Sequence, residues 1–476
     1  MNPVRDFDPR HFFARQPPEN LLCSPAIMNN TEFDVLVIGA GPGGYPAALK
    51  AAQLGKRAAI VEREHVGGVC LNSGCVPTKT LLASAECALK VRDAAVFGVD
   101  AALGRVDYAA MLARKNAVTQ KLRNGILGLL KKAGVTLVQG TARLEDATRV
   151  SVAGQWFSAR HIILATGSSP LVPAFLPRHP RVMDSTAFLN SLDALPRRLA
   201  ILGGGVIGCE FACMAAALGA KVTLVEKLND ILPMIDADLR RVLKKHLASL
   251  GVTIHTGAAL EDIAATDAEV TGRVGDEKIS ADILLVSIGR KTNLDGLGLE
   301  NAGLAPNAQG RIETDAWGRT PVPSIFAVGD INAASPQLAH FATAQATVAV
   351  EKIAGRRVTP ETLCPACIFT FPEIATVGLT EEQARTRGRD VRVSKFPFLA
   401  LGKALAINET DGFVKWVADA GSGQLLGAHV VGPHATELIA TAALAIRNEL
   451  TAAEAARTIH AHPTLSEAWM EAAQEI

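Results

Sequence analysis

The chain has 476 residues, which is too long for a single hydrophobic core, so two to four domains are expected. Its 48 Lys and Arg residues nearly balance its 47 Asp and Glu residues, and the resulting formal charge of +1 gives no electrostatic reason to expect nucleic acid or an anionic membrane as a partner. Apolar residues make up 49% of the chain, but charges and glycines interrupt them throughout, so no run of about 18 residues could span a bilayer.

Residues 1–30 contain several prolines and show no sustained hydrophobic period, so we expect a flexible extension there. Arg5, Arg10 and Arg15 would suit a transit peptide, but the acidic residues of the same segment would not. The segment also lacks the apolar stretch of a secretion signal. We therefore expect a cytoplasmic protein.

Two segments, residues 33–62 and 199–226, predict the same strand–helix–strand unit. In each, a buried strand runs into a glycine-rich turn, a helix follows, and a second strand ends at an acid, Glu62 in the first copy and Glu226 in the second. The first glycine and the acid are 23 positions apart in both copies (39 to 62 and 203 to 226). A repeated unit with matched spacing is much less probable by chance than a single match.

Each turn has the form GxGxxG, in which glycines let backbone N–H groups and the helix N-terminus approach a pyrophosphate, while the acid accepts from a ribose hydroxyl. Two dinucleotide sites are therefore predicted, one from Gly39, Gly41, Gly44 and Glu62, and the other from Gly203, Gly205, Gly208 and Glu226. A glycine-rich loop without a ligand remains the alternative for either copy alone. A carboxylate at position 226 would repel the 2′-phosphate of NADP, which favours NAD.

Further elements follow in chain order. Between the two units we expect helices at 78–91 and 108–132 and a strand at 161–165; after the second unit, strands at 281–288 and 323–328. From residue 362 the pattern changes to strands at 412–417 and 425–431 with helices at 437–448 and 452–460. The fold class is therefore α/β, with two Rossmann-like dinucleotide-binding domains and a C-terminal α+β domain.

Residues 67–79, GGVCLNSGCVPTK, contain two cysteines separated by four residues. The turn formers between Cys70 and Cys75 let the chain fold back, so that the two Cα atoms can reach disulfide range. Cys75 stands just before a predicted helix, and the helix N-terminus together with Lys79 would lower its thiol pKa. The stretch predicts an exchanging dithiol, with two inert core cysteines as the alternative.

At this stretch the chain resembles the pyridine nucleotide-disulphide oxidoreductase family, and the resemblance extends from about residue 32 to residue 471. Residues 165–168, ATGS, resemble the family's return from the flavin domain to the NAD domain. Residues 325–330, IFAVGD, resemble the segment whose aspartate binds the flavin ribityl chain. Residues 337–340, QLAH, resemble the stretch along the flavin ring, and residues 460–467, HAHPTLSE, resemble the catalytic-base motif.

The resemblance implies FAD and NAD as cofactors and a homodimer formed by the C-terminal domain. It implies an FAD site of Gly39, Gly41, Gly44, Glu62, Lys79, Ala142, Thr166, Gly167, Ser168, Asp330, Gln337, Leu338, Ala339 and His340, and an NAD site of Gly203, Gly205, Gly208, Glu226, Leu260 and Gly289. It divides the chain into an extension (1–30), an FAD-binding domain (31–157), an NAD-binding domain (158–284), a central region completing the FAD-binding part (285–355) and an interface domain (356–476).

The resemblance further implies oxidation of protein-bound dihydrolipoyl groups, with reduction of NAD to NADH. His462, oriented by Glu467, would be the base that generates the attacking thiolate, Cys70 would be attacked, and Cys75 would leave as a thiolate against the flavin. Lys79 and Glu210 would form the ion pair beside flavin N5. The base would come from the other subunit, and the partners would be lipoyl domains of 2-oxo acid dehydrogenase or glycine cleavage complexes.

Several alternatives remain open from the sequence. The reaction could instead be NAD(P)H-dependent reduction of another low-molecular-weight disulfide, or the chain could serve as an assembly subunit on a 2-oxo acid dehydrogenase core. Lys79 and Glu210 could form an ordinary surface salt bridge. Metal binding by His460 and His462, or by the CxxC at residues 364–367, is disfavoured because further ligands with suitable spacing are missing, and no metal is expected.

Overall fold

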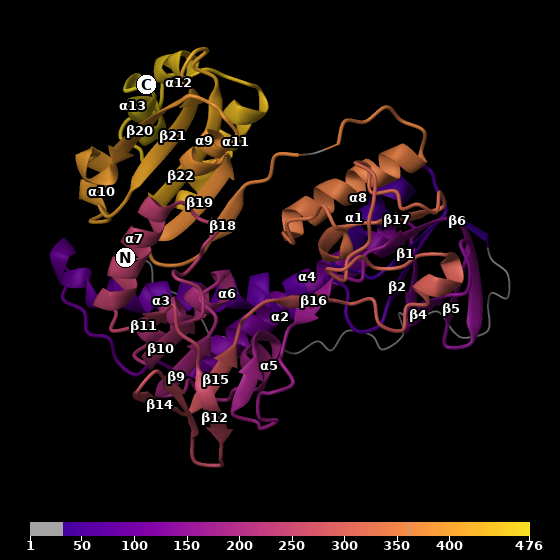
Figure 1. The fold of residues 1–476 in the computed structure, drawn as a ribbon, viewed down its shortest axis with the longest axis horizontal. Coiled ribbons are helices and arrows are strands. Elements are labelled where there is room, and N and C mark those ends of the chain that lie inside the picture. Colours follow the sequence, from indigo (N-terminus) through magenta and orange to yellow (C-terminus); the bar gives the residue numbers. More distant parts are fainter. Residues whose placement is uncertain (1–31, 361) are drawn as a thin grey trace, which may run out of the picture.

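The computed structural model describes residues 32–360 and 362–476, so the predicted N-terminal extension lies outside the described residues. The described chain forms three units (Figure 1). Two of them are sheets flanked by helices, and the third, at the C-terminus, is an antiparallel sheet with helices packed on it. This arrangement is the α/β fold with two Rossmann-like units and a C-terminal α+β unit that the sequence predicts.

The first unit is a seven-stranded sheet with strand order β3-β2-β1-β6-β5-β4, and β17 pairs with β6. The central strands are parallel and contain fully buried residues such as Val35, Leu36 and Val37, because helices cover both faces. Its elements are β1 (Glu32–Ile38), α1 (Gly44–Gln53), β2 (Ala58–Glu62), α2 (Gly68–Ser73), α3 (Cys75–Arg92), α4 (Tyr108–Lys132), β3 (Thr136–Gln139), β4 (Ala142–Leu144), β5 (Arg149–Val152), β6 (Gln155–Leu164), β17 (Ile325–Ala327) and α8 (Ala339–Ile353).

The second unit is a five-stranded parallel sheet with strand order β11-β10-β9-β15-β8, and a separate antiparallel sheet, β12-β13-β14, lies beside it. Its elements are β8 (Val182–Asp184), α5 (Ser185–Ser191), β9 (Arg198–Leu202), α6 (Val206–Ala217), β10 (Lys221–Glu226), α7 (Ala237–Ser249), β11 (Thr253–Thr256), β12 (Glu261–Ala265), β13 (Val270–Val274), β14 (Glu277–Ala281) and β15 (Ile283–Val286). A two-stranded link, β7 (Ser168–Pro170) with β16 (Arg290–Thr292), connects the first two units.

One sequence expectation needs correction here. The single strand predicted at 281–288 is two strands, because β14 ends at Ala281 and β15 begins at Ile283. Asp282, between them, turns its carboxylate to the backbone N–H and guanidinium of Arg198 at 2.8–3.0 Å. The predicted domain boundaries at 157/158 and 284/285 lie within β6 and β15, and the domain division stays a prediction.

The third unit is an antiparallel sheet with strand order β18-β19-β22-β21-β20. Its elements are β18 (Ala366–Ile368), β19 (Glu373–Gly378), α9 (Glu381–Thr386), β20 (Val391–Pro397), α10 (Gly402–Ala406), β21 (Phe413–Asp419), β22 (Leu425–Gly432), α11 (Ala435–Arg447), α12 (Ala452–Arg457) and α13 (Glu467–Gln474). The helix predicted at 452–460 therefore ends earlier, at Arg457. Trp416 and Trp469 pack against each other in this unit's core, with ring centroids 4.6 Å apart.

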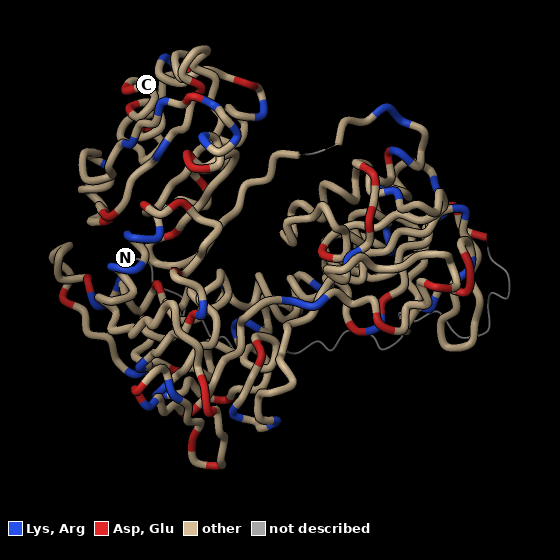
Figure 2. Tube along the Cα trace, viewed as in Figure 1, with Lys and Arg blue, Asp and Glu red and all other residues tan. Residues whose placement is uncertain are grey.

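Charges of both signs are interspersed over all three units (Figure 2), as the balanced composition suggests. In the described part of the chain, no helix combines the length and the apolar character needed to cross a membrane.

Truncation of the buried tryptophan tests the C-terminal core. Trp469 is 1% exposed, and its carbonyl oxygen accepts a hydrogen bond from Trp416 Nε1 at 2.9 Å. Trp469→Ala should lower the free energy of unfolding by about 3–5 kcal/mol, because it opens a large cavity. Denaturant titration followed by circular dichroism measures this loss. Trp156→Ala, at a site where the side chain is 46% exposed, is the control and should cost less than about 1 kcal/mol; equal losses would contradict the prediction.

Candidate active site

The two cysteines of the redox motif lie on consecutive helices. Cys70 is in α2, and Cys75 is the first residue of α3. Gly74 joins the helices, and a Cβ there would lie 3.0 Å from the Val69 carbonyl oxygen and 3.4 Å from the Cα of Cys70, so glycine permits the close approach. Both cysteines are free thiols, and their sulfur atoms are hydrogen-bonded to each other.

The helix that carries Cys70 packs directly on the first glycine-rich turn. The backbone N–H of Gly67 donates to the Ala40 carbonyl at 2.8 Å. A Cβ on Gly68 would lie 2.7 Å from the Cα of Gly41, and Gly68 also has a positive φ of 56°. Because Gly68 and Gly41 have no side chains, the thiol pair can lie beside the predicted pyrophosphate loop.

The two thiols have opposite pKa shifts. The hydrogen bond from Cys70 lowers the pKa of Cys75 to about 7, with a further contribution from the positive charge of Lys79 that outweighs the opposing effects of burial and Glu210. The same hydrogen bond, with burial, raises the pKa of Cys70. Cys70 is therefore the proton donor, and Cys75 carries the thiolate near neutral pH.

Lys79 and Glu210 form a partly buried ion pair between α3 and α6. Lys79 Nζ lies 2.8 Å and 2.7 Å from the two carboxylate oxygens of Glu210, whose side chain is only 4% exposed. This burial is inconsistent with the alternative of an ordinary surface salt bridge. The pair joins the first unit to the second beside the thiols.

The C-terminal unit also contacts this ion pair, which the sequence did not predict. The backbone N–H of Phe369 donates to Glu210 Oε1 at 3.0 Å, and Lys79 Nζ lies 4.5 Å from the centre of the Phe369 ring.

A second such contact lies within the first unit, where Arg123 of α4 donates to the side-chain oxygen of Asn72 at 2.7 Å and 3.0 Å. Neither residue belongs to a local motif, so only its place in the fold could identify it.

The first glycine-rich turn has the geometry of a pyrophosphate loop. Gly39 has φ +98°, and a Cβ on Gly44 would lie 1.8 Å from the Gly39 carbonyl oxygen, so neither position accepts a side chain. Around Gly41, by contrast, the nearest atom to a Cβ would be 3.8 Å away, which leaves the face of the turn open. Glu62 accepts from the backbone N–H groups of Ala40 at 2.7 Å and Glu64 at 2.8 Å. A carboxylate has further acceptor capacity, which a ribose hydroxyl can use.

The second turn repeats this geometry closely. Gly203 has φ +107°, a Cβ on Gly208 would lie 1.9 Å from the Gly203 carbonyl oxygen, and nothing lies within 4 Å of a Cβ on Gly205. Glu226 accepts from the backbone N–H groups of Gly204 at 2.7 Å and Leu228 at 2.8 Å. The two turns therefore agree in their hydrogen bonds as well as in their sequence spacing.

The remaining residues predicted to bind FAD lie where the first unit meets its neighbours. Thr166 Oγ1 is buried and has no hydrogen-bond partner among the described residues, which leaves it available to a ligand. Ser168 donates to the Asp330 carboxylate, and Arg290 donates to Ser168 Oγ at 2.7 Å. Gly167 has φ +67° in the link between the units.

The stretch at residues 337–340 forms the start of α8. Gln337 has a left-handed backbone with φ +60°, Leu338 is the N-cap, and Ala339 is the first helical residue. His340 turns toward the C-terminal unit, where its Nε2 lies 2.7 Å from the Pro365 carbonyl oxygen.

Three positions that the resemblance assigns to cofactor sites have surroundings typical of structural residues. Ala142 is in β4 and is 7% exposed in the core of the first unit, while Leu260 is 8% exposed in the core of the second. Gly289 has φ +138°, and its carbonyl accepts from the Leu171 N–H at 3.0 Å. Their assignment to cofactor sites remains a prediction.

His462 and Glu467 form a second hydrogen-bonded pair. His462 Nδ1 lies 2.8 Å from Glu467 Oε1, and because a carboxylate only accepts, Nδ1 carries the proton. The Thr464 N–H donates to the other oxygen at 2.7 Å, and this bond together with His462 lowers the pKa of Glu467. With the proton on Nδ1, Nε2 is the acceptor nitrogen of this tautomer, on a side chain that is 76% exposed.

The structure does not bring this pair to the thiols of the same chain. The loop between α12 and α13, which carries His462, lies at the far end of the C-terminal unit from α2 and α3 (Figure 1). Cys70, Cys75, Lys79 and Glu210 thus form one group, and His462 with Glu467 forms another.

The remaining candidate metal ligands are the cysteines at positions 364 and 367. Cys367 is in β18, where burial raises the pKa of its thiol to about 11. Cys364 Sγ lies 3.2 Å from His340 Nε2. Within residues 32–360 and 362–476, no three His, Cys, Asp or Glu side chains are grouped so that they could hold a metal ion.

Comparison with known proteins agrees with this geometry. Residues 33–346 match the family profile described as pyridine nucleotide-disulphide oxidoreductase, and residues 364–473 match the dimerisation domain of the same family. The chain is 44% identical over 452 residues to a dihydrolipoyl dehydrogenase of Chlamydia muridarum, covering 93% of this chain and 97% of that protein. It is 42% identical over 454 residues to a dihydrolipoyl dehydrogenase of Geobacillus stearothermophilus, covering 93% and 96%.

Two solved structures are similar over almost the whole chain. LpdA from Mycobacterium tuberculosis superposes with a TM-score of 0.87 at 30% identity, covering 94% of this chain and 99% of that one. The HOCl-induced flavoprotein disulfide reductase RclA from Escherichia coli gives a TM-score of 0.84 at 30% identity, covering 93% and 99%.

Removal of the lysine charge tests the electrostatics of the thiol pair. In the wild type, alkylation of Cys75 should follow a pH profile with a midpoint near pH 7, because its pKa is about 7. Lys79→Met removes the positive charge that lowers this pKa, so the midpoint should move to higher pH by about one unit or more. Mass spectrometry of iodoacetamide-treated reduced protein measures the profile. Cys87, exposed on the same helix, is the internal control. An unchanged midpoint for Cys75 would show that Lys79 does not set it.

Proposed function

The chain belongs to the pyridine nucleotide-disulphide oxidoreductase family and is therefore an oxidoreductase, and we propose that it oxidises protein-bound dihydrolipoyl groups to lipoyl groups with reduction of NAD to NADH. The observation that carries the proposal is the Cys70–Cys75 pair. It is a dithiol beside a pyrophosphate loop, with one thiol pKa lowered to about 7 and the other raised. The relatives described as dihydrolipoyl dehydrogenases support the choice of substrate.

FAD and NAD are the cofactors of this reaction, and the residues at both loops suit them. The open face of Gly41, the Glu62 carboxylate and the unpartnered Thr166 hydroxyl would hold FAD, with Asp330 beside them. When bound, FAD supplies the two-electron carrier between the dithiol and NAD. At the second loop, Glu226 would accept from the adenosine ribose, and its negative charge disfavours a 2′-phosphate.

The proposed exchange begins with the oxidised pair. Nε2 of His462 accepts a proton from one substrate thiol, and Glu467 stabilises the imidazolium. The substrate thiolate attacks Cys70 Sγ, the Cys70–Cys75 bond breaks, and Cys75 leaves as a thiolate, which the nearby Lys79 charge stabilises. The second substrate thiol then displaces Cys70, which releases the cyclic lipoyl disulfide and leaves the pair reduced.

We further propose that the base comes from the second subunit of a homodimer. The match of residues 364–473 to the family's dimerisation domain supports dimer formation through the C-terminal unit. Within one chain His462 lies far from α2, although its imidazole is oriented and exposed in the manner of a base. A partner subunit that supplies His462 would reconcile these two facts.

The proposed partners are lipoyl domains of 2-oxo acid dehydrogenase or glycine cleavage complexes, because their dithiol is the substrate. We propose that the enzyme works in the reducing cytoplasm. The similarity to the disulfide reductase RclA supports one second candidate, reduction of another low-molecular-weight disulfide by NADH.

Anaerobic titration distinguishes the two reactions. Dihydrolipoamide should bleach the visible flavin absorbance of the purified holoenzyme, and added NAD should restore it as NADH appears. Reduction by NADH without any response to dihydrolipoamide would favour the second candidate. Cys75→Ser should abolish the response while the protein retains FAD, and His462→Gln should lower turnover at least about 100-fold, which is the usual scale of general-base catalysis.

Mixed dimers test the origin of the base. A dimer of one Cys75→Ser subunit and one His462→Gln subunit, purified with two different tags, contains one site with an intact thiol pair. If the base comes from the partner, that site also has an intact His462, and the mixed dimer should recover about half of the wild-type activity. If the base acts within its own chain, both sites are defective and the mixed dimer should be as inactive as its parents.

A further inference from the structure

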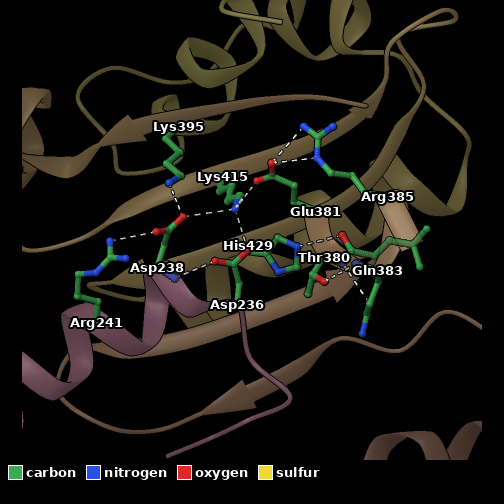
Figure 3. Close-up of polar contacts among 11 residues, drawn as sticks. Asp236, Asp238, Arg241, Thr380, Glu381, Gln383, Arg385, Lys395, Lys415 and His429 are labelled. Atoms are coloured by element: carbon green, nitrogen blue, oxygen red, sulfur yellow. Dashed lines mark hydrogen bonds and ion pairs between the residues drawn. The ribbon is translucent and has the colours of Figure 1, made fainter. Parts of the chain in front are cut away.

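A buried lysine links the second unit to the C-terminal unit. Lys415, on β21, is only 2% exposed, and its Nζ faces three carboxylates (Figure 3). The distances are 2.7 Å to Asp236, 3.5 Å to Asp238 and 3.3 Å to Glu381. We call these four residues the Lys415 cluster. Asp236 and Asp238 come from the start of α7, whereas Lys415 and Glu381 come from the C-terminal unit.

Charge complementarity keeps this cluster ionised. Burial acts to lower the pKa of Lys415, but the hydrogen bond and charge of Asp236, together with Glu381, hold it above its ordinary value. The pKa of Asp236 is lowered against its own burial by the same contact. His429 lies beside the pair, fully buried, and burial lowers its pKa, so it adds no charge. The lysine therefore remains a cation whose position is fixed by its partners.

Asp236 is also bonded within its own unit. One of its oxygens caps α7 by accepting from the Asp238 N–H at 2.9 Å, and the other binds Lys415. Residues 227–236 connect Glu226, the last residue of β10, to the start of α7, and Asp236 is the last residue of this segment. Asp236 thus ends the segment that begins at the carboxylate of the second dinucleotide loop.

The middle of this segment packs on the loop itself. The Leu232 N–H donates to the Gly204 carbonyl at 2.9 Å, and Gly204 in turn donates its N–H to Glu226 at 2.7 Å. Leu232 is fully buried and has a left-handed φ of 48°, which the surrounding contacts must enforce. A Cβ on Gly204 would lie 2.8 Å from Ile231 Cγ2, so the Gly204 loop and the 227–236 segment are in tight contact.

We propose that Lys415 is a positioning residue for the NAD site: it fixes the far end of the 227–236 segment through Asp236, and the segment fixes the Gly204 loop and Glu226. This inference rests on the proposed function, because it assigns NAD to the second loop. Lys415 itself does not contact the loop, so its effect is indirect. Buried ion pairs add little net stability over apolar replacements, whereas they can define geometry, and that is the role assigned to Lys415.

Lys415→Met is the central test, with NAD affinity measured by isothermal titration calorimetry on the FAD-loaded dimer. The dissociation constant for NAD should rise about fivefold or more, while FAD content stays at the wild-type level. Lys395→Met is the matched control, because Lys395 also lies beside Asp238 but is 43% exposed and does not bind Asp236. The control should bind NAD with wild-type affinity.

A second variant separates positioning from general stabilisation. Asp236→Asn retains the cap of α7 but removes the charge partner, so it should weaken NAD binding in the same direction even if Lys415→Met fails to fold. In the double variant, loss of both charges should restore most of the thermal stability lost in Lys415→Met, whereas NAD binding should remain weak.

The possible outcomes bear differently on the two proposals. A wild-type protein that binds no NAD would overturn both the proposed function and this inference. If the wild type binds NAD and the variants at positions 415 and 236 bind it equally well, only the inference fails. Recovery of stability and NAD affinity together in the double variant would also overturn it, because the pair would then act on stability alone.

Discussion

The carboxylate of Glu210 is the point on which the arrangement of the three units depends. Glu210 belongs to α6 of the second unit and is nearly inaccessible to solvent. It accepts hydrogen bonds from the Lys79 ammonium of the first unit and from the Phe369 N–H of the third. A buried carboxylate that loses its cation costs about 3–5 kcal/mol, so each unit is held in place by the others' contacts. Lys79 of this pair also adds to the lowering of the Cys75 thiol pKa, which the hydrogen bond from Cys70 dominates and Glu210 opposes. The contact between the units therefore lies within electrostatic reach of the thiol.

The two glycine-rich loops show how a repeated unit acquires two roles. Each loop closes on itself through the same pair of backbone hydrogen bonds to a strand-end glutamate, so the two sites are alike in isolation. Their surroundings differ. The first loop packs against Gly68 of α2, the helix that contains Cys70, whereas the second packs against the 227–236 segment, which the C-terminal unit contacts through Lys415. Under the proposed assignment of FAD to the first loop and NAD to the second, these different neighbours distinguish the two sites.

The C-terminal unit bears on the proposed reaction in two separate places. Phe369, near its start, contacts the Lys79–Glu210 pair of the same chain, and Glu467, near its end, orients His462. His462 is remote from the thiols of its own chain. Under the proposal that the base comes from a second subunit, the dimerisation domain and the proposed base lie in the same stretch of sequence.

Features with local signals could be predicted from the amino-acid sequence. The repeated GxGxxG turns, their glutamates at a fixed spacing, the two cysteines before a helix and the α/β order of elements all follow from short-range patterns, because each depends on residues within one turn or one strand–helix–strand unit. The prediction of one strand at 281–288 was wrong, and Asp282, where the strand is interrupted, binds the distant Arg198. The contacts of Phe369, Arg123 and Lys415 could be found only in the folded structure. Their partners lie far away along the chain, and a contact between distant charges produces no periodic pattern in a sequence.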